Sequence, residues 1–158
     1  MIAAYEPAQT TTTRASSRCG LRGTLPRMPI KRIEIRWRDL DGFGHVNNST
    51  YLTYLEEARD QHLTDVLGEA VHRTVIRRLE IDFISGLTQE DDYVDVDVRL
   101  TGVGSSSITL EESIVSVLDG RVAATAKTVM VHTDDSRTAS APWPHASRDA
   151  IDATLAAA

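Results

Sequence analysis

The chain has 158 residues, a formal net charge of −6 at pH 7 and one cysteine. This length fits a single domain with one hydrophobic core. The lone Cys19 gives no disulfide framework and fits a reducing compartment, so we expect a cytoplasmic protein. The first 32 residues hold six Lys or Arg and one Glu, which leaves about −11 for the remainder. Such an acidic body argues against nucleic-acid binding, which requires a basic surface.

Residues 1–29 are rich in Thr, Ser, Ala and Arg and show no apolar period. They contain no apolar stretch long enough for a signal peptide or a membrane span, so no membrane partner is expected. We predict a disordered or artefactual tail here, and a domain over 30–158. The acid-poor composition also fits an organelle transit peptide, which stays the alternative. Met28 is a candidate for an alternative translation start.

One strand and one long helix are predicted first. Alternating apolar residues predict a strand over 33–38. From Thr50 onward, apolar residues recur every three or four positions and predict a helix, for which Asn48 or Ser49 suits the N-cap. Gly68 is well placed to end this helix, because glycine tolerates a positive φ.

Four further strands follow the helix, over 74–84, 93–103, 106–117 and 121–133. The alternation changes phase near Glu111–Glu112, which predicts a β-bulge there. Asp119-Gly120 predicts a hairpin turn, and a short helix is expected over 147–155. The order predicts an α+β domain whose last four strands pair as an antiparallel meander.

The segment 39–59, DLDGFGHVNNSTYLTYLEEAR, carries most of the functional information. It runs from two carboxylates, Asp39 and Asp41, through two glycines and an Asn pair into the helix. This order places a carboxylate beside the unpaired N–H groups of a helix start. Attack on a carbonyl needs both, a base or nucleophile and donors for the oxygen that becomes negative.

This segment, together with the order of strand, helix and four strands, resembles the hotdog-fold acyl-CoA thioesterases. Within them, the sequence is most similar to the 4-hydroxybenzoyl-CoA thioesterase branch. The matching residues are Arg36, Asp39-Leu40-Asp41, Gly44-His45-Val46-Asn47-Asn48, Tyr51 and Glu57-Ala58-Arg59. The resemblance implies a long central helix wrapped by a five-stranded antiparallel sheet. It also implies a homodimer or homotetramer that binds acyl-CoA between subunits and needs no cofactor.

Family roles carried over by position make Asp41 the catalytic carboxylate, acting as nucleophile or as general base. Asn48 falls where the family uses a backbone N–H at the helix start to polarise the thioester carbonyl. Five further residues are candidate substrate contacts: His45, Asn47, Tyr51, Tyr54 and Glu57. Each has a structural alternative, namely the turn or helix cap for His45 and Asn47 and the core for the two tyrosines. For Glu57 it is a solvated helix face, or an ion pair with Arg59 at a subunit interface.

Two other sets of residues are weighed. Asp39 is interpreted as structural, bonded to backbone or to a nearby Arg in the turn 39–47, with a direct chemical role as the alternative. Arg77, Arg78 and Lys127 are candidates for contact with the CoA phosphates, with strand-edge solubilisation as the alternative.

Several absent motifs narrow the chemistry. The chain has no GxSxG elbow, no histidine spacing typical of a metal site and no hydratase-type Asp-x-Asn-x-x-His. We therefore predict a metal-free thioesterase that releases a carboxylic acid and CoA. A thioesterase acting on acyl-carrier protein and a non-catalytic acyl-CoA-binding protein stay as alternatives.

Overall fold

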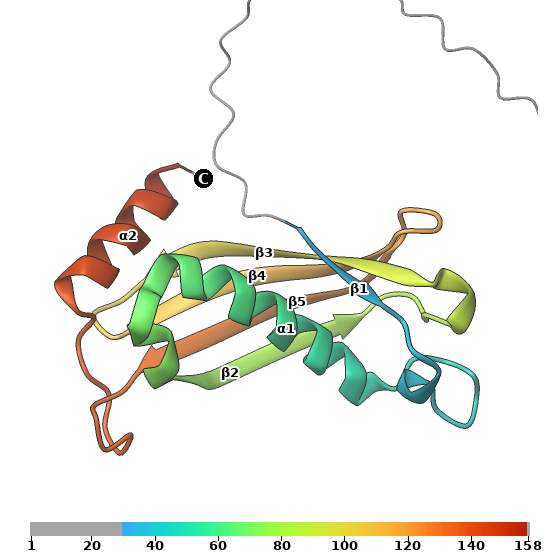
Figure 1. Cartoon of the computed structure of the whole chain (residues 1–158), viewed down its shortest axis with the longest axis horizontal. Coiled ribbons are helices and arrows are strands. Elements are labelled where there is room, and N and C mark those ends of the chain that lie inside the picture. Colours follow the sequence, from blue (N-terminus) through green and yellow to red (C-terminus); the bar gives the residue numbers. More distant parts are fainter. Residues whose placement is uncertain (1–29, 158) are drawn as a thin grey trace, which may run out of the picture.

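The computed structural model describes residues 30–157, so the predicted N-terminal tail lies outside the described residues. Within this range ten elements follow one another, and a long helix precedes most of the strands (Figure 1). They are β1 (Lys31–Glu34), η1 (Trp37–Asp39), α1 (Asn48–Leu67), η2 (Gly68–Arg73), β2 (Thr74–Phe83), η3 (Gln89–Asp91), β3 (Tyr93–Val103), β4 (Ser107–Ser116), β5 (Val122–His132) and α2 (His145–Ala156).

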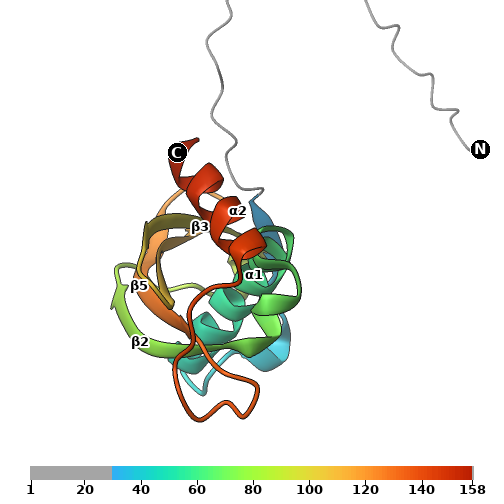
Figure 2. The ribbon, with the colours of Figure 1, turned by 90° about the vertical axis from the view of Figure 1, so that its left-hand side faces the viewer.

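The five strands form one antiparallel sheet in the order β1-β3-β4-β5-β2. The sheet curves round α1, as Figure 2 shows in the view turned by 90°. This is the hotdog fold that the resemblance implies. Along the inner face of β3, Val94, Val96 and Val98 are fully buried, and Ile108, Leu110 and Ile114 do the same on β4. No helix within residues 30–157 is long and apolar enough to cross a bilayer.

The predicted four-strand meander is wrong for β2. β3, β4 and β5 do follow one another, but β2 pairs with β5 from Thr74↔His132 to Phe83↔Ala124, at the edge far from β1. Alternating apolar and polar residues identify a strand but do not show which other strand it pairs with. The connection 84–92 is too long for a tight hairpin and carries the chain from the β2 edge of the sheet towards the opposite edge.

The first strand is shorter than predicted. It ends at Glu34, and the chain turns into η1 instead of continuing to Arg38. The carboxylate of Asp39 accepts the backbone N–H of Arg36 at 2.9 Å, which closes this turn. Trp37, which falls within the predicted strand 33–38, lies in this turn and is 84% exposed.

The helix α1 begins at Asn48 and its N-cap is Asn47, not Asn48 or Ser49 as predicted. The side-chain oxygen of Asn47 accepts the N–H of Ser49 at 2.9 Å, the usual N-cap bond. The end of the helix is as predicted, since Gly68 follows it with φ of 55°. The predicted C-terminal helix is also confirmed, with a slightly longer span, as α2.

The bulge predicted near Glu111–Glu112 is wrong. Both residues pair in regular register with β3 and β5. The register shifts lie elsewhere, between Leu100 and Gly102 in the β3–β4 pair and between Ile114 and Val115 in the β4–β5 pair. The apparent change of phase arises because Glu112 occupies an inward position. There its carboxylate accepts Nη1 of Arg59 at 3.0 and 3.2 Å and the hydroxyl of Thr128. Arg59, considered for a subunit interface, is thus buried in an ion pair within its own chain.

Candidate active site

The turn between η1 and α1 is closed by Asp41. Its N–H donates to the carbonyl oxygen of His45 at 2.7 Å, and its own carbonyl accepts the N–H of Gly44 at 3.1 Å. Gly44 has φ of 79°, a conformation that favours glycine. The carboxylate oxygen Oδ1 of Asp41 accepts the N–H groups of Phe43 at 2.8 Å and His45 at 3.3 Å. Oδ2 accepts no hydrogen bond from any residue in the range 30–157, so its lone pairs are not used within the described chain.

The other carboxylate of the pair, Asp39, is buried and anchors the turn. Its Oδ2 accepts the N–H and Nε of Arg36 and the hydroxyl of Tyr54, the last at 2.8 Å. Burial opposes ionisation of Asp39, but these hydrogen bonds hold the pKa of its carboxyl below the usual value. The carbonyl of Asp39 also accepts the N–H of Asn47 at 2.8 Å, which connects the turn to the helix start. Asp39 thus has the structural contacts that the sequence predicts.

A cavity of about 320 Å³ lies between this turn, the start of α1 and the end of β2. It brings together four of the predicted site residues, Asp41, His45, Asn48 and Tyr51. The remaining lining residues are Val46, Phe83, Ile84, Ser85 and Gly86.

Asn48 is the first residue of α1, at the positive end of the helix dipole. Its backbone N–H donates to no group in the part of the chain that the structure describes. Such unpaired donors at a helix start bind anions and negatively polarised oxygens. The cavity therefore combines an accessible carboxylate oxygen with a helix N-terminus.

The segment 84–88 forms the opposite wall. The carbonyl of Leu87 accepts the N–H of Val46 at 2.8 Å, and its N–H donates to the hydroxyl of Tyr51 at 3.2 Å. Gly86 packs directly on His45, because a Cβ at position 86 would lie 3.3 Å from Cδ2 of the imidazole. Burial raises the pKa of Tyr51, so its hydroxyl stays protonated at neutral pH.

Three predicted substrate contacts do not line this cavity. Asn47 caps the helix, and Tyr54 is fully buried against Asp39. Glu57 lies 3.6 Å from Nη2 of Arg36, at the surface of the helix. These side chains support the turn and the helix that carry the cavity residues.

The predicted phosphate contacts also lie elsewhere. Arg77 lines another cavity, of about 580 Å³, between β2, β5 and the 137–140 loop. Arg78 pairs with Glu80 of its own strand, and Lys127 stands opposite Glu80 and Glu111 in the sheet register. Within residues 30–157, no three His, Cys, Asp or Glu side chains are grouped so as to hold a metal ion.

The sequence alone did not place Phe83 or the wall 84–88 in the site. Phe83 packs edge-to-face on Tyr51, with ring centroids 5.2 Å apart, although the two residues belong to different elements. The only local signal is the Ser85-Gly86 pair directly after β2, which marks a turn without naming its neighbours.

The fold and this arrangement agree with a known family. The model of the thioesterase-like superfamily matches residues 35–155, and the chain belongs to that superfamily. Among solved structures, it is similar to a thioesterase from Thermus thermophilus that was crystallised with coenzyme A and zinc. The two share 33% identity with a TM-score of 0.73, over 83% of this chain and 97% of the other. A predicted thioesterase from Bacillus stearothermophilus shares 25% identity with a TM-score of 0.72, over 80% and 95% of the two chains.

Two curated proteins are also similar. YsmA, an uncharacterised protein of Bacillus subtilis, is 24% identical over 77% of this chain and 84% of its own. The chloroplastic acyl-acyl carrier protein thioesterase ATL3 of Arabidopsis thaliana is 27% identical over 73% of this chain. This match spans 64% of the plant protein.

Proposed function

We propose that the protein is an acyl-CoA thioesterase of the 4-hydroxybenzoyl-CoA thioesterase-like branch, and that it hydrolyses a thioester to a carboxylic acid and CoA. The observation that carries the proposal is the shared cavity of Asp41 and the start of α1. Membership of the thioesterase-like superfamily and the similarity to a thioesterase that binds coenzyme A support it.

In the proposed reaction the thioester carbonyl lies between Asp41 and Asn48. The N–H of Asn48 donates to the carbonyl oxygen, which becomes negative as the tetrahedral intermediate forms. The helix dipole stabilises the same charge. The C–S bond then breaks, and the thiolate of CoA takes up a proton.

The role of Asp41 has two forms that give the same products. As a general base, it takes a proton from the attacking water through its open Oδ2. As a nucleophile, it forms an acyl–aspartyl anhydride, which water then hydrolyses. In both, the N–H bonds to Oδ1 hold the carboxylate in place while Oδ2 reacts.

We assign substrate contact to His45 and Tyr51, which line the cavity. Asn47, Tyr54 and Glu57 act indirectly, through the helix cap and the Asp39 anchor. We further propose a homodimer or homotetramer with sites between subunits. The edge strand β2 exposes Val75, Ile76 and Phe83, and Ile84 follows; the last two also line the cavity. Apolar side chains on an exposed edge suit a protein interface.

A thiol-release assay over a panel of aliphatic and aromatic acyl-CoA substrates tests the proposal. We expect turnover of at least one member, with release of equal amounts of acid and CoA. Binding of acyl-CoA without release of thiol from any member would contradict hydrolysis and favour the non-catalytic acyl-CoA-binding function.

A thioesterase acting on acyl-carrier protein is the second candidate, favoured by the similarity to the Arabidopsis protein. The bond that is hydrolysed is the same, but the donor is attached to a protein. Matched acyl-CoA and acyl-carrier donors, measured side by side, distinguish the two. The acyl-CoA function predicts the higher kcat/KM for the CoA ester.

A further inference from the structure

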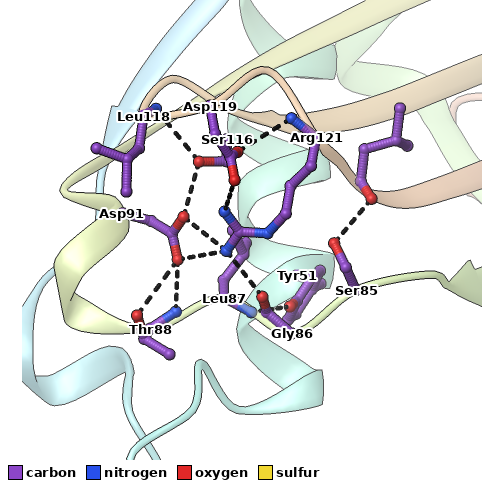
Figure 3. Close-up of polar contacts among 11 residues, drawn as sticks. Tyr51, Ser85, Gly86, Leu87, Thr88, Asp91, Ser116, Leu118, Asp119 and Arg121 are labelled. Carbon is purple, nitrogen blue, oxygen red and sulfur yellow. Dashed lines mark hydrogen bonds and ion pairs between the residues drawn. The ribbon is translucent and has the colours of Figure 1, made fainter.

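One guanidinium connects the wall of the cavity to a buried carboxylate. Arg121 follows the Asp119-Gly120 turn, directly before β5. Its Nη2 donates to the carbonyl oxygen of Gly86 at 3.0 Å and to Oδ2 of Asp91 at 2.7 Å (Figure 3). Gly86 lines the Asp41 cavity, whereas neither Arg121 nor Asp91 does. Among the lining residues, Arg121 therefore donates to the backbone of residue 86.

Asp91 is a fixed anchor for this guanidinium. It is 2% exposed, and its carboxylate accepts the hydroxyl of Ser116 at 2.7 Å and the N–H of Thr88 at 2.8 Å. Burial opposes its ionisation, but these bonds and Arg121 hold the pKa of Asp91 below its usual value. Asp119 holds the other terminal nitrogen of the guanidinium group: Nη1 of Arg121 donates to Oδ2 of Asp119 at 2.8 Å. Hydrogen bonds between a guanidinium group and carboxylates are strong and directional.

The residues on either side of Gly86 have other partners: the N–H groups of Ile84 and Ser85 donate to the carbonyl of Ala123, and the N–H of Thr88 donates to Asp91. Within residues 30–157, the carbonyl of Gly86 has Arg121 as its partner. Gly86 has no side chain to pack, so its place depends on the partners of its backbone. Its neighbour Leu87 is bonded on both sides to cavity elements, Val46 and Tyr51. A shift of residue 86 therefore reaches the ring of His45 directly and the hydroxyl of Tyr51 through one peptide unit.

We propose that Arg121 is a positioning residue for catalysis: by holding the carbonyl of Gly86, it sets the distance between the wall 84–88 and the residues His45 and Tyr51. The effect on turnover rests on the proposed thioesterase function. The mechanical part, that Arg121 immobilises the wall, holds for any ligand of this cavity.

The test compares Arg121→Ala with Arg32→Ala. Arg32 makes an equally short pair with Asp95, at 2.8 and 2.9 Å, and neither residue lines the cavity. For Arg121→Ala we expect kcat/KM to fall about 10- to 100-fold, mostly in kcat, since small misplacements at a reacting centre cost this much. Arg32→Ala should keep the wild-type values of kcat and kcat/KM.

Chemical rescue separates positioning from a general loss of stability. The side chain of Arg121 is 31% exposed, so a small cation can enter its place. Millimolar guanidinium should restore part of the kcat of Arg121→Ala and leave Arg32→Ala unchanged. The kcat of Arg121→Lys should be lower than the kcat of Arg121→Ala in the presence of guanidinium, because an ammonium group lacks the planar set of donors of a guanidinium group. Wild-type constants in Arg121→Ala, or a loss that guanidinium leaves unaltered, would overturn the proposal.

Hydrogen exchange gives a readout that needs no substrate. In Arg121→Ala, the amides of Val46 and Leu87 should exchange faster than in wild type and in Arg32→Ala. Unchanged exchange rates of these two amides in Arg121→Ala would overturn the claim that Arg121 immobilises the wall. If the wild-type protein hydrolyses no thioester while these amides do exchange faster, the proposed function fails and the positioning of the wall stands.

Discussion

Asp41 and His45 are joined in both directions: the N–H of Asp41 donates to the carbonyl of His45 at 2.7 Å, and the N–H of His45 donates to Oδ1 of Asp41 at 3.3 Å. Both residues line the same cavity. The turn thus fixes the carboxylate relative to the backbone of His45 through Oδ1, and leaves Oδ2 of Asp41 without a hydrogen bond from residues 30–157. In the proposed reaction this carboxylate acts against a carbonyl held by the helix start.

The proposed role of the Asn48 amide is tested by proline. Asn48 is the first residue of α1, where proline is well tolerated because the helix does not use that N–H. Asn47 has φ −60° and ψ 137°, an extended conformation that is compatible with a following proline. Asn48→Pro should therefore keep the fold and lower kcat by about 10²- to 10³-fold, the usual effect of removing one oxyanion donor.

Asn48→Ala is the matched control, because it keeps the backbone N–H and removes only the side chain. We expect nearly wild-type kcat for this variant in the same thiol-release assay. Equal losses in the two variants would assign the role to the side-chain amide and contradict the proposed donor.

The buried pair Arg59–Glu112 makes a prediction about stability. Glu112→Gln leaves the guanidinium of Arg59 in the core without a counter-charge. Breaking one partner of a buried pair costs about 3–5 kcal/mol, whereas replacing both with apolar residues is far less costly. In urea denaturation, Glu112→Gln should therefore have a lower free energy of unfolding than the double variant Arg59→Met/Glu112→Leu.

The exposed pair Arg32–Asp95 is the control for this series. Asp95→Asn should leave the free energy of unfolding nearly unchanged, as is typical of a surface pair. A similarly small loss in Glu112→Gln would show that the core tolerates an unpaired guanidinium at this place.

His62 predicts a dependence of stability on pH. Its side chain is buried, and neither ring nitrogen has a hydrogen-bond partner within residues 30–157. Burial lowers its pKa below the ordinary 6.5, although Asp97 and Asp65 oppose this shift, and Lys31 adds to it. The unfolded chain therefore binds this proton at a higher pH than the folded chain. The resulting stability is fully present above pH 6.5 and is lost as the pH falls towards the lowered pKa.

His62→Leu removes this proton uptake. Between about pH 7 and about pH 5, the free energy of unfolding of the variant should fall less steeply than that of the wild type. Urea denaturation at several pH values measures both slopes. A wild-type slope in His62→Leu would contradict the prediction.

The parts of the fold that sequence predicted well are those with a strong local signal. The limits of β3 match the prediction because its valines alternate with charged residues without interruption. The helix α1 ends where Gly68 permits a positive φ. The partner of β2 could not be predicted, because pairing depends on where the connection 84–92 leads. Glu112 was misread because an inward carboxylate looks like a break in alternation unless its buried partner, Arg59, is known.

The same distinction holds for the candidate site. Asp41, His45, Asn48 and Tyr51 lie within eleven consecutive positions, and a turn followed by a helix brings them to one cavity. Tyr54 follows the same helical spacing but points to Asp39 in the core. The wall 84–88 and Arg121 are distant in sequence and join the site through tertiary packing and hydrogen bonds.

The kcat of Asp41→Asn in a folded protein tests the central claim most directly. Asparagine keeps an oxygen that can accept the N–H groups of Phe43 and His45, so the turn should survive. We predict an unchanged circular dichroism spectrum and melting temperature, with thioester turnover lowered by about 10²- to 10⁴-fold. Wild-type turnover in folded Asp41→Asn would contradict the claim that this carboxylate performs the chemistry.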